Sequence, residues 1–248
     1  MPDSSPLASN KAGQRLAHRI EGDILDEGLR PGARLGSESD LMSRYDTSRT
    51  LLREAVRILE HDGICEMRRG PGGGMYVRDM DDDAVSHAAA LWLQFTGAPV
   101  EDLYDVRHVL ETRCAAWAAE RIDDRGVALL TQCRRREDEA IADGDIAALN
   151  AAVNDFHVAI AEASGNAVAS LFVKVLSELN RSYSGAASYS DDEIAATRRA
   201  HQALADAIVS GDPVLAAHRA TVHMRASCEF SQSQRSTRQR STRQGKRT

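Results

Sequence analysis

The chain has 248 residues, a net charge of −6 and 42% hydrophobic residues, which is enough material for one small domain and one larger domain. It contains no run of 18 apolar residues, and its first residues lack the basic-then-apolar pattern of an export signal, so we expect a cytoplasmic protein without a membrane partner. Four cysteines without regular spacing argue against a disulfide framework and favour buried free thiols.

Charge is distributed unevenly along the chain. Residues 11–78, here called the head, carry 12 basic and 11 acidic side chains, whereas residues 79–230 carry 13 basic and 25 acidic ones. The segment 231–248 is basic and repeats the sequence RSTRQ, so we expect a disordered tail there and a disordered stretch at residues 1–10. Because the acidic part repels DNA, any attraction to DNA must come from local arginines in the head.

Two helical patterns separated by a short polar turn occupy the first part of the segment 35–77. The second pattern has an apolar stripe at three- and four-residue spacing, formed by Leu52, Val56 and Leu59. In the turn before it, Thr47 or Ser48 can cap the second helix, because a hydroxyl there accepts from an unpaired amide of the first turn. Helix, tight turn and second helix make a helix-turn-helix motif.

Arginine and hydroxyl side chains lead this second helix. Arg49, Thr50 and Arg53 lie outside the apolar stripe, near the start of the helix. Such a helix start suits the major groove of DNA, because arginine pairs with guanine edges and hydroxyls bond phosphates or bases.

After Gly63 the pattern changes to that of two short strands, 64–69 and 75–77, around a glycine-rich loop. This predicts a hairpin, or wing, with Arg68 and Arg69 at its tip. A phosphate-binding loop is excluded, because no GK[ST] sequence follows the glycines. A helical domain with merely solvated arginines is the alternative, but the order of helix, turn, arginine-led helix and basic wing favours DNA binding.

The alanine-rich segment 85–230, here called the body, predicts an all-helical bundle, because one 3.6-residue period follows another. Glycines and prolines separate the expected helices, at 82–95, 100–121, 124–143, 146–164, 166–185, 191–210 and 213–230. The expected fold is therefore mainly α: a winged helix-turn-helix with a small β-hairpin at 11–78, a linker at 79–84, and a C-terminal helical bundle.

Three of these helices place a histidine on or beside an apolar face: His157, His201 and His223. A buried imidazole needs a partner, and three that converge would suit a divalent metal such as zinc or nickel. Taken singly, each is more often a satisfied core histidine, so the metal hypothesis requires that they meet in space.

Arg107 lies on the apolar stripe that Leu103, Leu110 and Cys114 share. Its ordinary explanation is a pair with Glu111 one turn later, worth ~0.3 kcal/mol if exposed. The alternative is a guanidinium that is kept inside the bundle to clamp a carboxylate ligand with two hydrogen bonds.

The head resembles the GntR family of bacterial transcription regulators. The resemblance rests on the pattern I…G.L.PG..L at residues 24–35, the run SRTLLREAVRILEHDG at 48–63, and the wing residues Gly74, Tyr76 and Val77. In the FadR subfamily, the positions that match Arg49, Thr50, Arg53, Arg69 and Gly70 approach DNA; we add Arg44 and Ser48 to this expected set. Gly36 replaces the family's usual proline, and Ser39 replaces an arginine that commonly contacts the operator.

The body resembles FCD, the helical effector domain that defines the FadR subfamily, through LYDVR at 103–107, FHVAIAEASGN at 156–166, and the spacing of two later histidines around Gly211. The resemblance implies a divalent metal held by His157, His201 and His223, and an aspartate one turn before the first. Val153 occupies that position, so we expect water or an effector to complete the metal shell, with lower metal affinity.

The resemblance also favours the clamp explanation of Arg107. We expect Arg107, Glu111 and Asn154 to contact the effector. Asn154 is one of the nearest polar side chains to the missing aspartate position.

These expectations combine into a regulator, acting as a repressor, that binds double-stranded operator DNA as a homodimer and responds to a small carboxylic acid. One alternative makes the metal itself the effector. A less favoured alternative is a metal-dependent hydrolase. The segments around the histidines offer no paired general base, since Glu162 and Asp206 fall on other faces, so we expect no enzyme.

Overall fold

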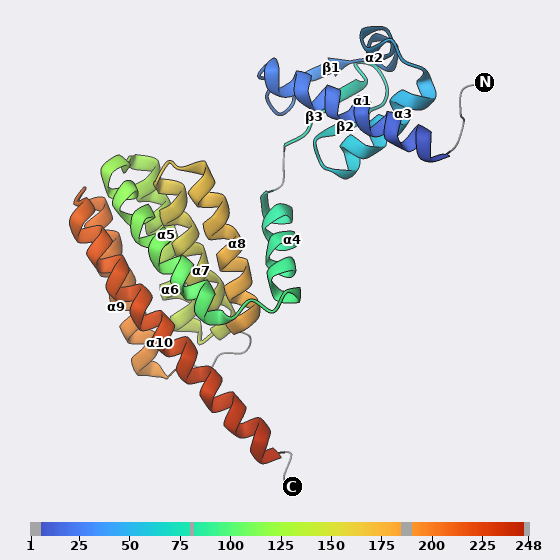
Figure 1. Ribbon diagram of the computed structural model, residues 1–248. Coiled ribbons are helices and arrows are strands. Elements are labelled where there is room, and N and C mark those ends of the chain that lie inside the picture. Colours follow the sequence, from blue (N-terminus) through green and yellow to red (C-terminus); the bar gives the residue numbers. More distant parts are fainter. Residues whose placement is uncertain (1–5, 80–81, 185–189, 246–248) are drawn as a thin grey trace. The chain divides into compact units, whose positions relative to one another are not determined.

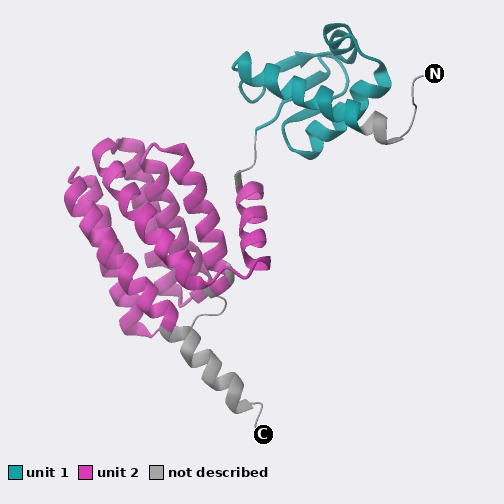
Figure 2. Cartoon of the chain, viewed as in Figure 1, with its two compact units in different colours: residues 1–81 teal, residues 82–248 magenta. Residues whose placement is uncertain are grey.

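The computed structural model describes residues 6–79, 82–184 and 190–245. The chain forms two compact units, residues 1–81 and residues 82–248 (Figure 2). Helices dominate both units, and the only sheet among the described residues is small and lies in the first unit (Figure 1). The expected fold class, mainly α with an N-terminal winged helix-turn-helix, is confirmed.

Within residues 6–79, the first unit contains three helices and three strands. In chain order these are α1 (Pro6–Asp26), β1 (Arg34–Gly36), α2 (Glu38–Tyr45), α3 (Arg49–His61), β2 (Cys65–Arg68) and β3 (Gly74–Val77). The antiparallel sheet has the strand order β1-β3-β2, and β2 and β3 form the wing hairpin with Met67 opposite Met75.

Hydroxyl caps define the helix-turn-helix. Ser37 begins α2 with a capping box, in which its Oγ accepts from the Asp40 amide and the Asp40 carboxylate accepts from the Ser37 amide. Of the two cap candidates for α3, Ser48 is the cap: its Oγ accepts from the Leu51 amide at 3.3 Å. The turn between the helices passes through Asp46 at a positive φ of 46°. The Ser37 cap therefore sets where α2 begins, and the Ser48 cap sets where α3 begins.

Strand β1 was not expected, because three residues are too short to show a two-residue period. It pairs with β3, with an irregular register between Arg34 and Gly36. Glycine is required at Gly74, where φ is +141° and an added Cβ would lie 2.4 Å from the carbonyl oxygen of Gly36. The close approach of the two backbones thus explains a glycine of the wing.

The second unit is a helical bundle. Its helices are α4 (Asp82–Phe95), α5 (Val100–Arg121), α6 (Asp124–Asp143), α7 (Ile146–Ala163), α8 (Ala167–Ser184), α9 (Asp191–Val209) and α10 (Pro213–Gly245). Figure 1 shows α5 to α9 side by side, and α10 packs against α5 and α9. Fully buried apolar side chains, among them Leu130, Phe156, Leu204 and Ile208, fill the space between the helices.

The helix bounds agree with the sequence pattern to within one residue, except at the chain ends. Residues 231–245 continue α10 instead of forming a disordered tail, because no glycine or proline interrupts the helix before Gly245. Pro6 to Asn10 likewise belong to α1. Residues 1–5 and 246–248 of the expected disordered ends lie outside the described residues. No helix among the described residues is long and apolar enough to cross a membrane.

Candidate functional site

The start of α3 presents the side chains that the sequence pattern predicts for DNA contact. Arg49, Thr50 and Arg53 are all exposed. The carboxylate of Glu38, at the start of α2, lies 3.2 Å from Nε of Arg53 and 3.7 Å from Nε of Arg49. One acidic group therefore holds both arginines of the recognition helix. Sequence reasoning did not single out Glu38, because the two helices meet only in the folded unit.

The wing is held in shape by its own side chains. The hydroxyl of Tyr76 donates to the Gly72 carbonyl at 2.6 Å, and Arg34 donates to the Gly73 carbonyl at 3.0 Å. Arg68 lies over the Tyr76 ring, with its guanidinium carbon 4.3 Å from the ring centroid. Arg69 and Gly70, both in the expected set, are exposed at the tip of this ordered loop.

Two other expected DNA contacts have partners within the protein. Arg44 donates to Asp23 on α1 at 3.1 Å and to Glu27 just after the end of that helix, so its guanidinium is held against α1. Ser48 uses its hydroxyl as the α3 cap. Ser39 carries no guanidinium, so it cannot make the contact expected of an arginine at this position. Its hydroxyl lies 2.8 Å from that of Ser37.

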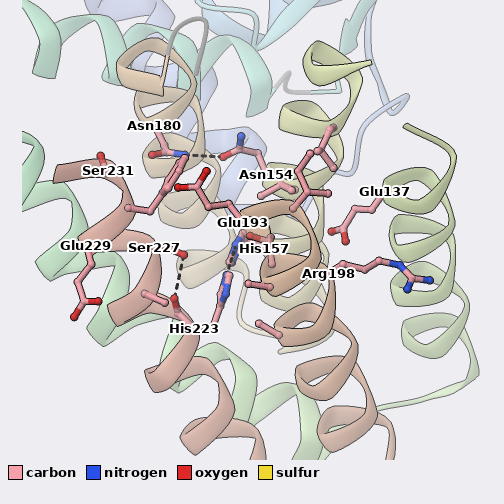
Figure 3. Close-up of a pocket in the computed structure, with 18 of the residues that line it drawn as sticks. Glu137, Asn154, His157, Asn180, Glu193, Arg198, His223, Ser227, Glu229 and Ser231 are labelled. Atoms are coloured by element: carbon pink, nitrogen blue, oxygen red, sulfur yellow. Dashed lines mark hydrogen bonds between the residues drawn. The ribbon is translucent and has the colours of Figure 1, made fainter. Parts of the chain in front are cut away.

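In the second unit, the three histidines meet. His157 on α7, His201 on α9 and His223 on α10 are buried, and their Nε2 atoms face one another (Figure 3 shows His157 and His223). Nε2 of His223 lies 3.1 Å from that of His201 and 3.3 Å from that of His157. The convergence that the metal hypothesis required is present, since three Nε2 atoms can coordinate one ion from one side.

Carboxylates lie behind two of the imidazoles. Glu137 Oε1 is 2.7 Å from Nδ1 of His201, and Glu111 Oε2 is 2.6 Å from Nδ1 of His157. A proton on Nδ1 directed at a carboxylate leaves the lone pair of Nε2 toward the cluster, which is the arrangement that metal-binding histidines use. The Glu137 contact therefore sets His201 in the ligating form, and the Glu111 carboxylate lies close enough to Nδ1 of His157 to favour the same form there.

Each of these carboxylates also pairs with a buried arginine. Arg107 Nε donates to Glu111 Oε1 at 2.5 Å, and Arg134 donates to Glu137. Burial acts to raise the pKa of Glu111, but the neighbouring Arg107 and His157 outweigh it and lower this pKa to about 2. Two relays of arginine, glutamate and histidine thus converge from different helices, and the lowered pKa of Glu111 keeps that carboxylate ionised.

Burial keeps two of the imidazoles, those of His201 and His223, neutral. It lowers the pKa of His223 to about 3, with the neighbouring His157 acting in the same direction. Burial also lowers the pKa of His201 well below its ordinary value, followed by the effect of His223. A neutral imidazole is the form that coordinates a metal ion.

Sequence reasoning missed Glu137 and Arg134. Both lie on the apolar face of α6 that carries Leu130, Cys133 and Ala140, and Glu137 is 1% exposed. Charged residues at helical spacing on an apolar face were the available signal, the same one that pointed to Arg107.

A cavity of about 480 Å³ opens beside the histidine cluster, lined by residues of α5 to α10. Arg107, Val153 and Asn154 line it together with His157 and His223. Figure 3 shows Asn154, His157 and His223 among the lining residues. Of the three expected effector contacts, Arg107 and Asn154 reach this cavity. Glu111 lies behind His157 and Arg107, beside a second, much smaller space.

Each of the two units matches a known protein family model. Residues 12–77 match the model described as "Bacterial regulatory proteins, gntR family", and residues 102–226 match the FCD domain. A solved GntR structure from Streptococcus agalactiae is 25% identical, covers 88% of this chain and 99% of its own, and superposes with a TM-score of 0.66.

Named relatives agree with these matches. The chain is 28% identical over 164 residues to the Uxu operon transcriptional regulator of Escherichia coli K12, which is 66% of this chain and 63% of that protein. It is 30% identical over 138 residues to the regulator LutR of Bacillus subtilis, 56% of this chain and 61% of the relative. The chain thus spans about three fifths of the length of these relatives. It belongs to the GntR family of bacterial regulatory proteins, which are not enzymes, and carries an FCD domain.

Proposed function

We propose that the protein is a transcriptional repressor of the FadR subfamily, whose binding to operator DNA is controlled by a small carboxylic acid in the cavity of the helical unit. The observation that carries this proposal is the coexistence, in one chain, of an arginine-led recognition helix and a cavity beside a buried histidine cluster. One relative, NanR of Klebsiella aerogenes, is named as a repressor and is 26% identical over 165 residues. The site of action is the cytoplasm, where bacterial DNA lies.

For the head, the proposed DNA contacts are the exposed side chains at the start of α3 and at the wing tip. They are Ser48, Arg49, Thr50, Arg53, Arg69 and Gly70, with Arg44 at the edge of the set. Two heads of a homodimer would reach successive major grooves of a pseudo-palindromic operator, about 34 Å apart. A single head is nearly neutral and attracts DNA weakly, so pairing two copies supplies the affinity.

The histidine cluster fits a divalent metal such as zinc or nickel. Three nitrogen donors, two of them with a carboxylate at Nδ1, match the donor set of zinc sites with an open position. His157, His201 and His223 would hold the ion, which would attract an effector oxygen as a Lewis acid. Val153 supplies no ligand, so water or the effector completes the shell.

The two units would be coupled if the effector binds one arrangement of the dimer more tightly than another. An effector that prefers one arrangement of the dimer shifts the population toward it and changes the spacing of the heads. The second candidate function makes the metal itself the effector. The two carboxylate-supported imidazoles favour that candidate, because such support strengthens metal binding whether or not an organic acid is present.

The experiment is a titration of operator DNA in the presence and absence of zinc and of candidate carboxylic acids. It compares the wild type with His157→Ala and with His218→Ala, an exposed histidine of α10 outside the cluster. We expect zinc or acid to change operator affinity in the wild type and in His218→Ala, and to have no effect in His157→Ala. An unchanged response in His157→Ala would eliminate the proposed site.

A further inference from the structure

The cavity beside the histidines has two unlike walls, and together they describe a ligand. One wall is polar and comes from Tyr104 and Arg107 on α5, Asn154 on α7 and Asn180 on α8. The other wall is apolar. It comes from Ile141 on α6, Leu149 and Val153 on α7, and Ile194 and Ala200 on α9. A cavity of about 480 Å³ is within the size range of sites for small organic ligands, roughly 300–1,000 Å³.

The polar wall is a chain of hydrogen bonds that runs in one direction. Tyr104 donates to Oδ1 of Asn180 at 3.1 Å, Asn180 donates to Oδ1 of Asn154 at 3.1 Å, and Asn154 donates to the Asn150 carbonyl at 2.7 Å. Both amide oxygens are therefore engaged as acceptors, whereas each amide nitrogen carries a second N–H. This wall offers donors to a ligand.

Arg107 adds a positive charge to the same wall. Its Nε donates to Glu111, so the terminal nitrogens of the guanidinium are the atoms that can donate to a ligand. The side chain is only 3% exposed. A guanidinium so placed can pair with a carboxylate through two parallel hydrogen bonds. The donors of the polar wall thus surround a site for one anionic group.

Two of the three acidic side chains that line the cavity are engaged elsewhere, and the third, Glu229, is exposed. Glu137 contacts His201 through one oxygen and Arg134 through the other. Glu193 caps α9, where its Oε2 accepts from the amide and the hydroxyl of Ser190. Hydroxyl groups spread along a ligand would need acceptors, and the apolar wall supplies none.

We propose that the cavity binds a monocarboxylate with a compact apolar body, either aromatic or branched aliphatic, and that Val153 selects against polyhydroxylated acids. The carboxylate lies against Arg107 and the two amides, and the body packs on the apolar wall. Val153 stands one turn before His157, so the surface next to the cluster is apolar where an aspartate would make it charged and wet. That this ligand is the effector rests on the proposed function; its chemical class rests on the two walls.

The test is calorimetric titration of the full chain, without DNA and with equimolar zinc throughout. The probes are 3-phenylpropanoate, 4-methylpentanoate, the neutral amide 3-phenylpropanamide, and gluconate as a polyhydroxylated acid. We expect one or both apolar acids to bind at least about tenfold more tightly than the amide and than gluconate, since an ion pair and an apolar contact are both needed. Tighter binding of gluconate or of the amide, or no binding of either apolar acid, overturns the proposal.

A matched pair of variants locates the contact. Val153→Thr adds a hydroxyl to the apolar wall at constant size, and Val158→Thr makes the same change on α7 outside the cavity, where Val158 packs against the core. We expect Val153→Thr to weaken binding of the favoured acid about three- to tenfold and Val158→Thr to leave it unchanged. Equal affinities in the wild type and in Val153→Thr, with the fold of each variant checked by thermal unfolding, contradict the assignment of the wall.

These measurements separate the ligand class from its regulatory role. If gluconate binds and releases operator DNA, the regulatory function stands and the ligand class is wrong. If an apolar acid binds but leaves operator affinity unchanged, the ligand class stands and control by that acid is wrong.

Discussion

Glu137 and His201 are 64 residues apart in the chain, yet Glu137 Oε1 lies 2.7 Å from Nδ1 of His201, and both side chains are almost completely buried. The contact orients the imidazole and selects the tautomer whose Nε2 lone pair faces His157 and His223. On α5, the carboxylate of Glu111 lies 2.6 Å from Nδ1 of His157 and favours the same tautomer of that imidazole. The cluster is thus preorganised by groups that do not belong to it.

Removing one supporting carboxylate should weaken metal binding. We expect Glu137→Gln to lower zinc affinity about 10- to 100-fold, because His201 loses the group that fixes its tautomer. The measurement is competition with a chromophoric chelator. Glu139→Gln, an exposed residue of α6 paired with Arg135, is the control and should bind zinc as the wild type does. Equal affinities in all three proteins would mean that Glu137 has only a packing role.

Metal binding should also stabilise the helical unit. At a free zinc concentration of 100 times its Kd, the folded state gains about 2.7 kcal/mol. For a chain of this size, that corresponds to a rise in Tm of roughly 5–10 °C. We expect zinc to raise the Tm in the wild type and not in His201→Ala. Scanning calorimetry measures the Tm with zinc, and the Tm of the same protein in chelator is the reference. A similar rise in His201→Ala would place the zinc elsewhere.

Without metal, stability should depend on pH in a defined direction. The pKa of His223 is lowered to about 3 in the folded protein, compared with 6.5 for an ordinary imidazole. Between these values the unfolded chain binds a proton that the folded chain does not, so stability falls as the pH drops from 6.5 toward 3. The lowered pKa of Glu111, about 2, adds a loss in the same direction below its ordinary 4.5.

Urea unfolding in chelator, at several pH values, measures this dependence. In His223→Gln we expect a flatter change of unfolding free energy between pH 6.5 and pH 5.5, where Glu111 is almost fully ionised in both states. A slope equal to that of the wild type would contradict a buried neutral imidazole at this position.

The two arginines of α3 should contribute differently to DNA binding. We expect Arg49→Ala to reduce discrimination between operator and random DNA by about 1–3 kcal/mol, because the first turn of a recognition helix reaches base edges. Arg53→Ala should weaken binding to operator DNA and to random DNA by more similar amounts, as expected of a phosphate contact. Fluorescence anisotropy at fixed salt measures both, and equal losses on both DNAs for Arg49→Ala would count against a base contact.

Glu38 offers a control for these variants, since it holds both arginines in the structure. We expect Glu38→Gln to strengthen binding to random DNA, because removing a carboxylate releases two guanidiniums for phosphates and removes a repulsive charge. Discrimination should fall accordingly. Unchanged binding to random DNA would show that Glu38 does not compete with phosphate.

The sequence alone determined the order of elements from α2 onward and the faces of the helices, because helix periodicity, hydroxyl caps and glycine breaks act over a few residues. Ser48, Arg49 and Arg53 at the start of α3, and the three histidines on apolar faces, were predicted on that local basis. The family resemblance added what local patterns cannot, namely that the histidines form one site.

Only the tertiary structure decided which side chains meet. The pairs Glu137–His201 and Glu38–Arg53, the pairing of Arg44 with α1, and the strand β1 all join segments that are distant in the chain. Periodicity reports which face of a helix is buried, but not which residue of another helix lies against it. That partner depends on how whole helices pack, and in this chain it determines both the form of the histidines and the two walls of the cavity.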